Sequence, residues 1–359
     1  MKTAFRWYGE GSDSVSLSDI RQIPGRPVIV GVLDGKAAGE VWTEQEIGAY
    51  RRHIEDSGLR LEVIESVNIH EDIKLGAPAR DQYIENFIKT IQNLGAQGIR
   101  VVCYNFMPAI DFVRTDLAWE LEDGSKALYY DQKALEGMTP DQLVDATFQK
   151  SGGFTLPGWE PERLYKLKET MERYQGLTPD DLRKNYRYFL EAVIPACEQC
   201  DVRLAVHPDD PGWEIFGLPR LAHSMEDYQR IMDMVDSPYN GITLCTGSLG
   251  SNPGNNVPEM IRYFCKRDRV PFAHIRNIRF LGERTFAESG HLSAEGSLDI
   301  CEILRAFYES GFDGYIRPDH GRTIWNEKCR PGYGLYDRAL GLMYIMGIWE
   351  ALEKGASRR

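Results

Sequence analysis

Four side chains of types that bind transition metals stand at the ends of short apolar runs. The runs are Val202–His207, Ile242–Cys245, Val270–His274 and Gly314–Asp319. Each run is typical of a buried strand, and residues at the C-terminal ends of strands face the active site of a parallel α/β barrel. Two imidazoles, one thiolate and one carboxylate suit a divalent transition ion, whereas Mg²⁺ and Ca²⁺ take oxygen ligands. We therefore predict a metal centre formed by His207, Cys245, His274 and Asp319.

Each of these residues also has an ordinary explanation. A single histidine is more often a hydrogen-bonded structural residue than a ligand, and a single cysteine at a strand end is more often a small apolar core residue. The four share one structural position on consecutive expected strands and together supply a complete set of ligands. That agreement, rather than any one residue, supports the metal centre.

Apolar runs alternate with segments of helical periodicity along the whole chain. The first four expected strands are Ala4–Tyr8, Pro27–Leu33, Leu59–Glu65 and Ile99–Phe106, and the runs above supply the last four. The expected helices are Leu17–Gln22, Thr43–Ser57, Ala79–Leu94, Glu160–Gln199 (broken near Gly176), Met225–Val235, Val257–Lys266, Ser297–Glu309 and Leu335–Glu353. Eight such units predict an α/β fold, a single (β/α)8 TIM barrel domain over residues 1–359. An open doubly wound sheet is the competing architecture, but no Gly-x-Gly-x-x-Gly turn follows the early strands.

Two stretches exceed what a bare barrel needs. Residues Met107–Trp159 follow the fourth strand, and within them Leu117–Glu122 and Lys126–Asp131 flank Asp123-Gly124, which predicts a β-hairpin. This insertion leaves the catalytic end of a strand, so it is either a lid that excludes water or a surface excursion or subunit contact. The second stretch, residues 276–295, lacks helical periodicity and places polar side chains above the same face, namely Arg276, Asn277, Arg279, Glu288 and His291.

The composition limits the classes of partner. The 359 residues are 42% hydrophobic, enough for one large core, and carry a formal net charge of −12, which opposes binding to a nucleic-acid backbone. No apolar run is long enough to cross a bilayer, and the first residues lack the apolar core of a signal peptide. We therefore expect a cytoplasmic protein without a membrane partner. The seven cysteines favour free thiols, and the redox-like spacing of Cys197 and Cys200 is interpreted as structural.

Short motifs spread over nearly the whole chain carry a further signal. They are Phe5–Gly9, Gly39–Trp42, His207–Pro211, Cys245–Ser248, His274–Asn277, Arg317–Arg322 and Gly332–Arg338. With these motifs the chain resembles the mannonate dehydratases of bacterial hexuronate breakdown, members of the xylose-isomerase-like barrel group. The resemblance implies a hydro-lyase that converts D-mannonate to 2-keto-3-deoxy-D-gluconate. It also implies Mn²⁺ or Fe²⁺ at the four residues named above, and because both ions accept this mixture of ligands, the sequence leaves the choice open.

Dehydration of an aldonate requires a base that takes the C2 proton and an acid that protonates the departing C3 hydroxyl. By the resemblance, His320 and Tyr333 form this pair, and the carbon at which each acts is left open. A supporting role for His320 and loop packing for Tyr333 are the alternatives. Arg6, Arg276 and Arg322 are candidates for holding the substrate carboxylate, because a planar guanidinium can donate two parallel hydrogen bonds to it.

Other functions fit parts of this pattern. A metal-dependent sugar isomerase or epimerase of the same barrel group would share the fold, but such enzymes favour carboxylate-rich metal sites, and here Cys245 replaces an oxygen ligand. A barrel endonuclease holds several Zn²⁺ ions with more His and Glu ligands, and the acidity of the chain opposes DNA binding. A sugar-binding module without activity would need no metal. The partner we expect is therefore a small-molecule aldonate, bound by a homo-oligomer whose size the sequence leaves open.

Overall fold

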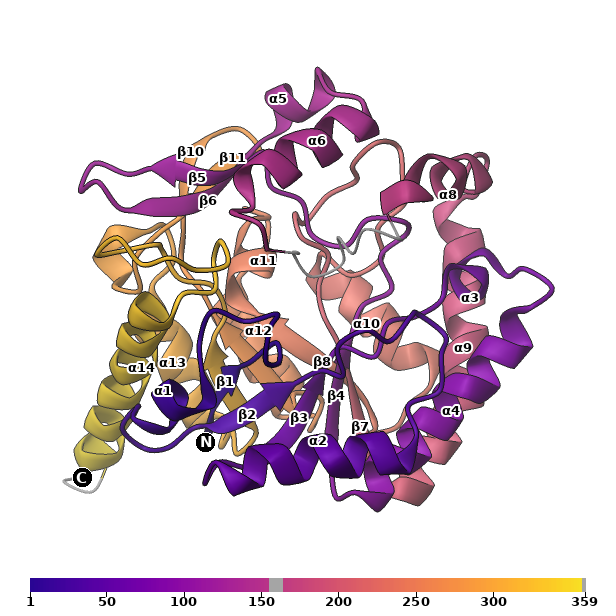
Figure 1. The fold of residues 1–359 in the computed structure, drawn as a ribbon, viewed down its shortest axis with the longest axis horizontal. Helices are drawn as coiled ribbons and strands as arrows, with labels where there is room; N and C mark the ends of the chain where they lie inside the picture. The colour runs from indigo at the N-terminus through magenta and orange to yellow at the C-terminus, as the bar shows by residue number, and fades with distance from the viewer. Residues whose placement is uncertain (155–163, 357–359) are drawn as a thin grey trace.

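Eight parallel strands close into a barrel at the centre of the protein. The computed structural model describes residues 1–154 and 164–356. The barrel strands are β1 (Lys2–Arg6), β2 (Val28–Gly31), β3 (Leu61–Glu65), β4 (Val101–Tyr104), β7 (Arg203–Val206), β8 (Asn240–Cys245), β9 (Phe272–Ile275) and β12 (Tyr315–Pro318). They are neighbours in this order, and β12 closes the barrel on β1. The predicted (β/α)8 barrel is confirmed (Figure 1).

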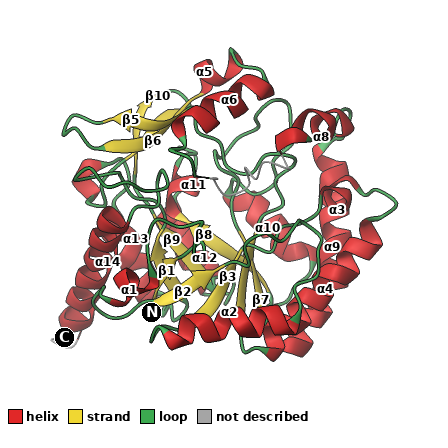
Figure 2. Ribbon diagram, in the orientation of Figure 1, coloured by secondary structure: helices red, strands yellow, loops and turns green. Residues whose placement is uncertain are grey.

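Helices surround the barrel, as Figure 2 shows. They are α1 (Leu17–Arg21), α2 (Glu44–Asp56), α4 (Arg80–Ala96), α9 (Pro179–Cys200), α10 (Met225–Met234), α12 (Val257–Cys265), α13 (Ile300–Glu309) and α14 (Leu335–Ala356). Local sequence sets some of their starts, since Thr43 and Thr178 form capping boxes with Glu46 and Asp181. The predicted break in the long fourth helix is confirmed, because α8 (Leu167–Arg173) ends before α9 begins. The predicted start of that helix, residues 160–163, lies outside the described residues.

Two apolar layers hold the barrel together. Small and branched side chains fill its interior, among them Val63 and Val101. Their neighbours Ile64 and Val102 point the other way and pack in the larger cluster between the strands and the helices. Burial on both faces explains why the strands read as continuous apolar runs in the sequence. Polar side chains therefore collect beyond the strand ends, where function is expected in this fold.

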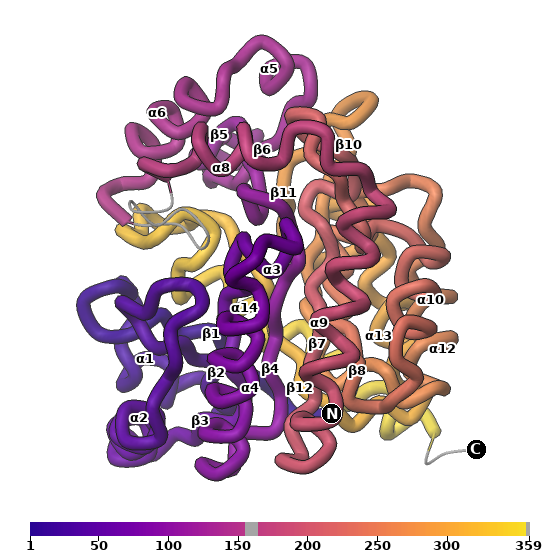
Figure 3. Tube along the Cα trace, turned by 90° about the vertical axis from the view of Figure 1, so that its right-hand side faces the viewer, coloured from indigo at the N-terminus to yellow at the C-terminus, as the bar shows by residue number. Residues whose placement is uncertain are grey.

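A second, antiparallel sheet of four strands lies beyond the C-terminal ends of the barrel strands. We call it the cap sheet, and its order is β10 (Ile278–Gly282), β11 (Thr285–Glu288), β6 (Lys126–Asp131) and β5 (Asp116–Glu120). Figures 1 and 3 show it on the same side of the barrel in both views, together with α5 (Gln132–Glu136) and α6 (Pro140–Lys150). The predicted hairpin is confirmed as β5 and β6. Residues 155–159 of the predicted insertion lie outside the described part of the chain.

The two excursions expected from the sequence form the cap sheet jointly. Strand β6 of the first pairs with β11 of the second, with Tyr130 opposite Phe286. These two rings and that of Trp213 belong to an apolar cluster separate from the barrel core. The sequence predicts neither β10 nor β11, and it gives no sign of their pairing with the hairpin, because strands so distant along the chain share no local pattern.

The described residues include three further short elements. They are α3 (Glu71–Leu75), α11 (Thr246–Gly250) and the 3₁₀ turn Ser293–Glu295. In the two described ranges, no helix combines the length and the apolar character that crossing a membrane requires. The seven cysteines are all free thiols.

Candidate metal centre and active site

The C-terminal ends of four neighbouring strands bring the four predicted metal ligands together. Cys245 ends β8 and His274 lies in β9, where the two are direct partners in the ladder. His207 follows β7, and Asp319 follows β12. One ligand atom of each residue lies within 4.8 Å of the ligand atoms of the other three. The convergence expected from the strand ends is therefore found in the structure.

The donor atoms of this cluster fit a divalent transition ion. His207 Nδ1 lies 2.8 Å from the carbonyl oxygen of the following residue and donates to it, which leaves the electron pair of Nε2 free. Nδ1 of the fully buried His274 lacks a hydrogen-bond partner, a costly arrangement unless a further group completes it. Cys245 Sγ lies 3.4 Å from Asp319 Oδ2. Two imidazoles, a sulfur and a carboxylate so placed suit a transition ion better than Mg²⁺ or Ca²⁺.

Neighbouring cations keep Asp319 ionised. Burial alone would raise the pKa of its carboxyl, but the positive charges around it, those of Arg317 and Arg276 among them, outweigh that effect and hold the pKa well below its ordinary value. Nη2 of Arg317 lies 3.0 Å from Oδ1, and Nη1 of Arg276 lies 3.5 Å from Oδ2. The carboxylate is thus available as a negatively charged ligand.

His320 and Tyr333 are in direct hydrogen-bond contact beside this cluster. The Tyr333 hydroxyl lies 2.8 Å from His320 Nε2, which is 3.8 Å from Asp319 Oδ1. Nδ1 of the same ring lies 2.8 and 2.9 Å from the two carboxylate oxygens of Glu288. Nη1 of Arg276 also lies 2.8 Å from Nδ1, but it donates to Glu288 Oε1 at 2.9 Å. Because a carboxylate only accepts hydrogen bonds, we assign the ring hydrogen to Nδ1, which leaves Nε2 to accept from the Tyr333 hydroxyl. Burial raises the pKa of Tyr333 well above its ordinary value, so the phenol keeps its proton.

Glu288 belongs to a buried network of two carboxylates and two guanidinium groups. Arg114 donates to Asp210 at 2.8 and 3.0 Å and to Glu288 at 2.8 Å. Arg276 donates to the same two carboxylates, at 2.8 Å to Asp210 and 2.9 Å to Glu288. Burial alone would raise the pKa of both carboxyls, but the surrounding cations hold the pKa of each below its ordinary value. The network ties the loop after β7, which carries Asp210, to both excursions of the chain.

Most of this network was not predicted from the sequence. Glu288 was expected only as a polar residue above the catalytic face, and neither Arg114 nor Asp210 was assigned a role. Asp210 stands in the His-Pro-Asp-Asp-Pro segment, three residues after His207. Two adjacent aspartates so close to a predicted metal ligand could have indicated that Asp210 belongs to the site. No pattern surrounds Arg114, and only the folded chain brings it to Glu288.

The three arginines predicted to hold the substrate carboxylate lie in different surroundings. Arg276 adjoins the ligand cluster, and its Nε is buried without a hydrogen-bond partner. Arg6, buried at the end of β1, donates through Nη1 to two backbone carbonyl oxygens at 2.8 and 3.1 Å. Arg322 donates to Asp337 at 3.1 Å and to Asp123 at 3.1 Å. The structure thus brings Arg276 to the centre, whereas the contacts of Arg322 lie with α14 and the hairpin tip.

The cap sheet contacts the loop that follows β12 and carries the His–Tyr pair. Lys126 and Thr323 exchange backbone hydrogen bonds of 2.7 and 3.1 Å. Leu128 of β6 packs directly on Gly332, where an added Cβ would lie 2.8 Å from Leu128 Cδ1. The insertion is therefore joined to the loop of the active site, and its role as a lid or an interface stays a prediction.

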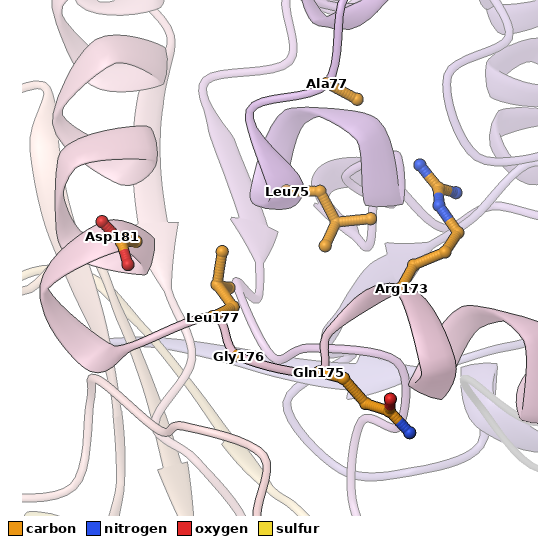
Figure 4. A pocket seen from close by; sticks show the side chains of 7 residues that line it. All are labelled: Leu75, Ala77, Arg173, Gln175, Gly176, Leu177 and Asp181. Atoms are coloured by element: carbon orange, nitrogen blue, oxygen red, sulfur yellow. The ribbon is translucent and has the colours of Figure 1, made fainter.

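Two open cavities are lined by residues other than those of this centre. Figure 4 shows one of about 480 Å³, to which α3, α8 and α9 contribute Leu75, Arg173 and Asp181. A second, of about 660 Å³, lies between α5, the loop around Trp213 and the turn at Arg284. None of the predicted site residues lines either cavity. The predicted chemistry belongs instead to the enclosed strand ends below the cap sheet.

Fold and donor set together define a (β/α)8 barrel protein with a candidate centre for a divalent transition ion. Comparison with known proteins supplies the family. The family model described as D-mannonate dehydratase (UxuA) matches residues 1–359. The chain belongs to the D-mannonate dehydratase family.

Similar proteins match along their whole length. The mannonate dehydratase of Lachnoclostridium phytofermentans is 60% identical over 357 residues, which cover 99% of this chain and 100% of that protein. That of Thermotoga maritima is 58% identical over 358 residues, or 100% of this chain and 99% of that protein. The crystal structure of mannonate dehydratase from Streptococcus suis serotype 2 has a TM-score of 0.90 at 41% identity, covering 99% of this chain and 96% of that chain. The resemblance seen in the sequence is confirmed.

Proposed function

We propose that this chain is a hydro-lyase that removes water from D-mannonate to give 2-keto-3-deoxy-D-gluconate, a step of hexuronate breakdown. The observation that carries the proposal is the 2.8 Å contact between His320 and Tyr333 beside a cluster of four metal-capable donors. Dehydration next to a carboxylate needs a proton-transfer pair and a positive charge at one place. Membership of the family supports the same reaction.

The metal ligands in this proposal are His207, Cys245, His274 and Asp319, and the ion is Mn²⁺ or Fe²⁺. When bound, the ion supplies positive charge that stabilises the negative charge developing beside the substrate carboxylate as the C2 proton leaves. The buried, unpartnered Nδ1 of His274 is the strongest support for an ion here. Both ions accept mixed nitrogen, oxygen and sulfur ligands, so the supply of metal in the cell decides occupancy.

His320 and Tyr333 carry the proton transfers. One of them takes the proton from C2, and the other gives a proton to the hydroxyl that leaves C3 as water. The C2–H and C3–O bonds break, a C2=C3 double bond forms, and the resulting enol becomes the 2-keto acid when its hydroxyl proton is lost and C3 gains one. The direct contact between Nε2 and the phenolic oxygen then allows a proton to pass between the two side chains, which restores the pair.

The remaining predicted residues hold and shield the substrate. Arg276 is the arginine nearest the ligand cluster, and Arg6 and Arg322 are the further candidates for the carboxylate. The insertion, with its cap sheet, excludes water while charge develops. We expect the enzyme to be a cytoplasmic homo-oligomer that acts on this small molecule without nucleic-acid or membrane partners.

An assay on a panel of aldonates tests this function. The protein is stripped of metal with a chelator and then restored with Mn²⁺ or Fe²⁺, and the 2-keto acid formed is measured. We expect product from D-mannonate only after the metal is restored, and far less from D-gluconate, which differs at C2. Turnover that is insensitive to the chelator, or isomerisation of a sugar without any 2-keto acid, would contradict the proposal.

A further inference from the structure

His274 lies between two carboxylates on opposite edges of its ring. Nδ1 lies 3.5 Å from Asp319 Oδ1, and Nε2 lies 3.4 Å from Glu65 Oε2. Asp319 is one of the four donors of the metal cluster, so the Nδ1 edge faces that cluster. The Nε2 edge faces Glu65, the last residue of β3, which the sequence analysis did not single out.

One guanidinium group holds both of these carboxylates in place. Nη2 of the buried Arg317 donates to the two oxygens of Glu65 at 2.8 and 3.0 Å, and Nε lies 3.2 Å from Oε2. The same Nη2 lies 3.0 Å from Asp319 Oδ1. Such a fork fixes the plane of the Glu65 carboxylate and keeps it ionised. Glu65 can therefore only accept from the imidazole that faces it.

The residues around Glu65 could instead form a second metal site, since Glu65, Cys103 and His274 also place ligand atoms within 4.8 Å of one another. Two contacts oppose it. Both oxygens of Glu65 already accept from Arg317, and Cys103 Sγ accepts the hydroxyl hydrogen of Thr243 at 3.2 Å. Burial also raises the pKa of the Cys103 thiol well above its ordinary value, and a protonated thiol is a poor ligand. Glu65 and Arg317 therefore support the four-donor metal cluster and do not form a site for a second ion.

We propose that Glu65 is a positioning residue of the metal centre: it accepts the Nε2 hydrogen of His274 and so leaves the Nδ1 electron pair facing the other donors. A carboxylate behind a metal-bound imidazole fixes its tautomer and orientation and makes it a stronger ligand. Removing such a partner weakens metal binding about 10- to 100-fold. This inference rests on the metal site of the proposed function, and it adds a residue that never touches the ion or the substrate.

The test is a titration of the metal-free protein with Co²⁺ alone, followed by the thiolate-to-cobalt absorption of Cys245. Glu65→Gln should raise the Kd for Co²⁺ about 10- to 100-fold. A glutamine replaces one of the two acceptor oxygens with an amide NH₂ that cannot accept, so the fork from Arg317 and the contact with His274 can no longer both be kept intact. Glu62→Gln is the matched control on the same strand, because the Glu62 carboxylate contacts the Tyr315 hydroxyl at 2.7 Å and Nε of Arg60 at 3.0 Å, on the far end of the barrel from the metal cluster. The control should bind Co²⁺ with the wild-type Kd.

Two further measurements keep the result clear if Glu65→Gln fails to fold. Glu65→Asp retains the charge but withdraws the carboxylate, and it should also weaken binding. In the Co²⁺-loaded wild-type protein, NMR should show two shifted, exchangeable imidazole protons, one from Nδ1 of His207 and one from Nε2 of His274. A folded Glu65 variant with the wild-type Kd, or a single such proton, would overturn the inference. A wild-type protein that binds no Co²⁺ would instead remove the metal site of the proposed function.

Discussion

Arg322 joins the loop after β12 to the tip of the inserted hairpin, since its Nη1 lies 3.1 Å from Asp123 Oδ2, 199 residues away in sequence. Its Nη2 and Nε donate to Asp337 in the first turn of α14, at 3.1 and 3.4 Å. The two partners differ in exposure, because the side chain of Asp123 is 57% exposed and that of Asp337 is 1% exposed. Exposed ion pairs contribute little to stability, whereas an unpaired buried charge is costly. The contact with Asp337 should therefore dominate the energetics of Arg322.

Replacing each partner of this pair separates two roles of Arg322. Arg322→Gln should lower the free energy of unfolding by about 1.5–3 kcal/mol, because the buried Asp337 loses its charged hydrogen bonds to the guanidinium but keeps its contacts with His291 and with the backbone N–H of residue 322. Asp123→Asn should cost less than about 1 kcal/mol. Unfolding in urea gives both values, and steady-state kinetics on D-mannonate accompanies them. A raised KM in Arg322→Gln with unchanged stability would show that Arg322 acts mainly on the substrate, as the sequence predicts.

Loss of one proposed metal ligand should empty the centre. We expect Cys245→Ser and His207→Ala each to lower metal content by an order of magnitude or more, since each removes one of four donors and disturbs the geometry of the rest. Emission spectroscopy on purified, folded protein measures the content. Cys301→Ser is the matched control, because Cys301 is a free thiol of α13 outside the cluster. Full occupancy in either ligand variant would rule out the four-ligand site.

The hydroxyl of Tyr333 is expected to matter for turnover and not for metal binding. Tyr333→Phe removes one oxygen, keeps the ring that packs against Tyr8, and should lower kcat by on the order of 10²- to 10⁴-fold. Metal content and thermal unfolding should match the wild type. Tyr344→Phe, on α14, removes a hydroxyl that contacts Cys301 and should leave kcat unchanged. An unchanged kcat in Tyr333→Phe would assign that ring to loop packing.

Apolar patterning was sufficient to predict the barrel. A strand buried on both faces leaves a continuous apolar run, so Pro27–Leu33 and Leu59–Glu65 could be recognised, and the structure places β2 and β3 within them. The same logic brought the four candidate metal ligands together, because a residue such as His207 or Cys245 that ends an apolar run must lie at a strand end. Position along one strand is local information, and a single sequence contains it.

Contacts between distant segments could not be predicted in this way. Arg114 and Glu288 are 174 residues apart and meet only because β6 pairs with β11. Glu65 was included in an expected strand. Its proposed role at the metal centre depends on its contact with Arg317 of β12, which only the closed barrel provides. Such pairings are set by the closed fold and leave no periodic or compositional trace in either segment.

Glu288 provides the last prediction, because it fixes the tautomer of His320. The carboxylate accepts from Nδ1, so Nε2 is left to accept from Tyr333. In Glu288→Gln the amide NH₂ can donate to Nδ1, which moves the ring hydrogen to Nε2 and reverses the contact with Tyr333. We expect kcat to fall by on the order of 10²- to 10⁴-fold, the range seen when a proton-transfer residue is disabled or held in the wrong tautomer.

The measurement that separates this effect of Glu288→Gln from simple loss of structure is the comparison of kcat with metal content. A tautomer change at His320 should lower kcat while the metal stays bound, whereas collapse of the network with Arg114 and Arg276 should lower both together. Glu283→Gln, in the exposed turn between β10 and β11, is the matched control and should leave kcat within about twofold, since surface substitutions have small effects. Glu288→Asp keeps an acceptor that cannot donate, so it should recover part of the lost kcat. A metal-loaded Glu288→Gln enzyme with wild-type kcat would show that His320 finds its orientation without this carboxylate.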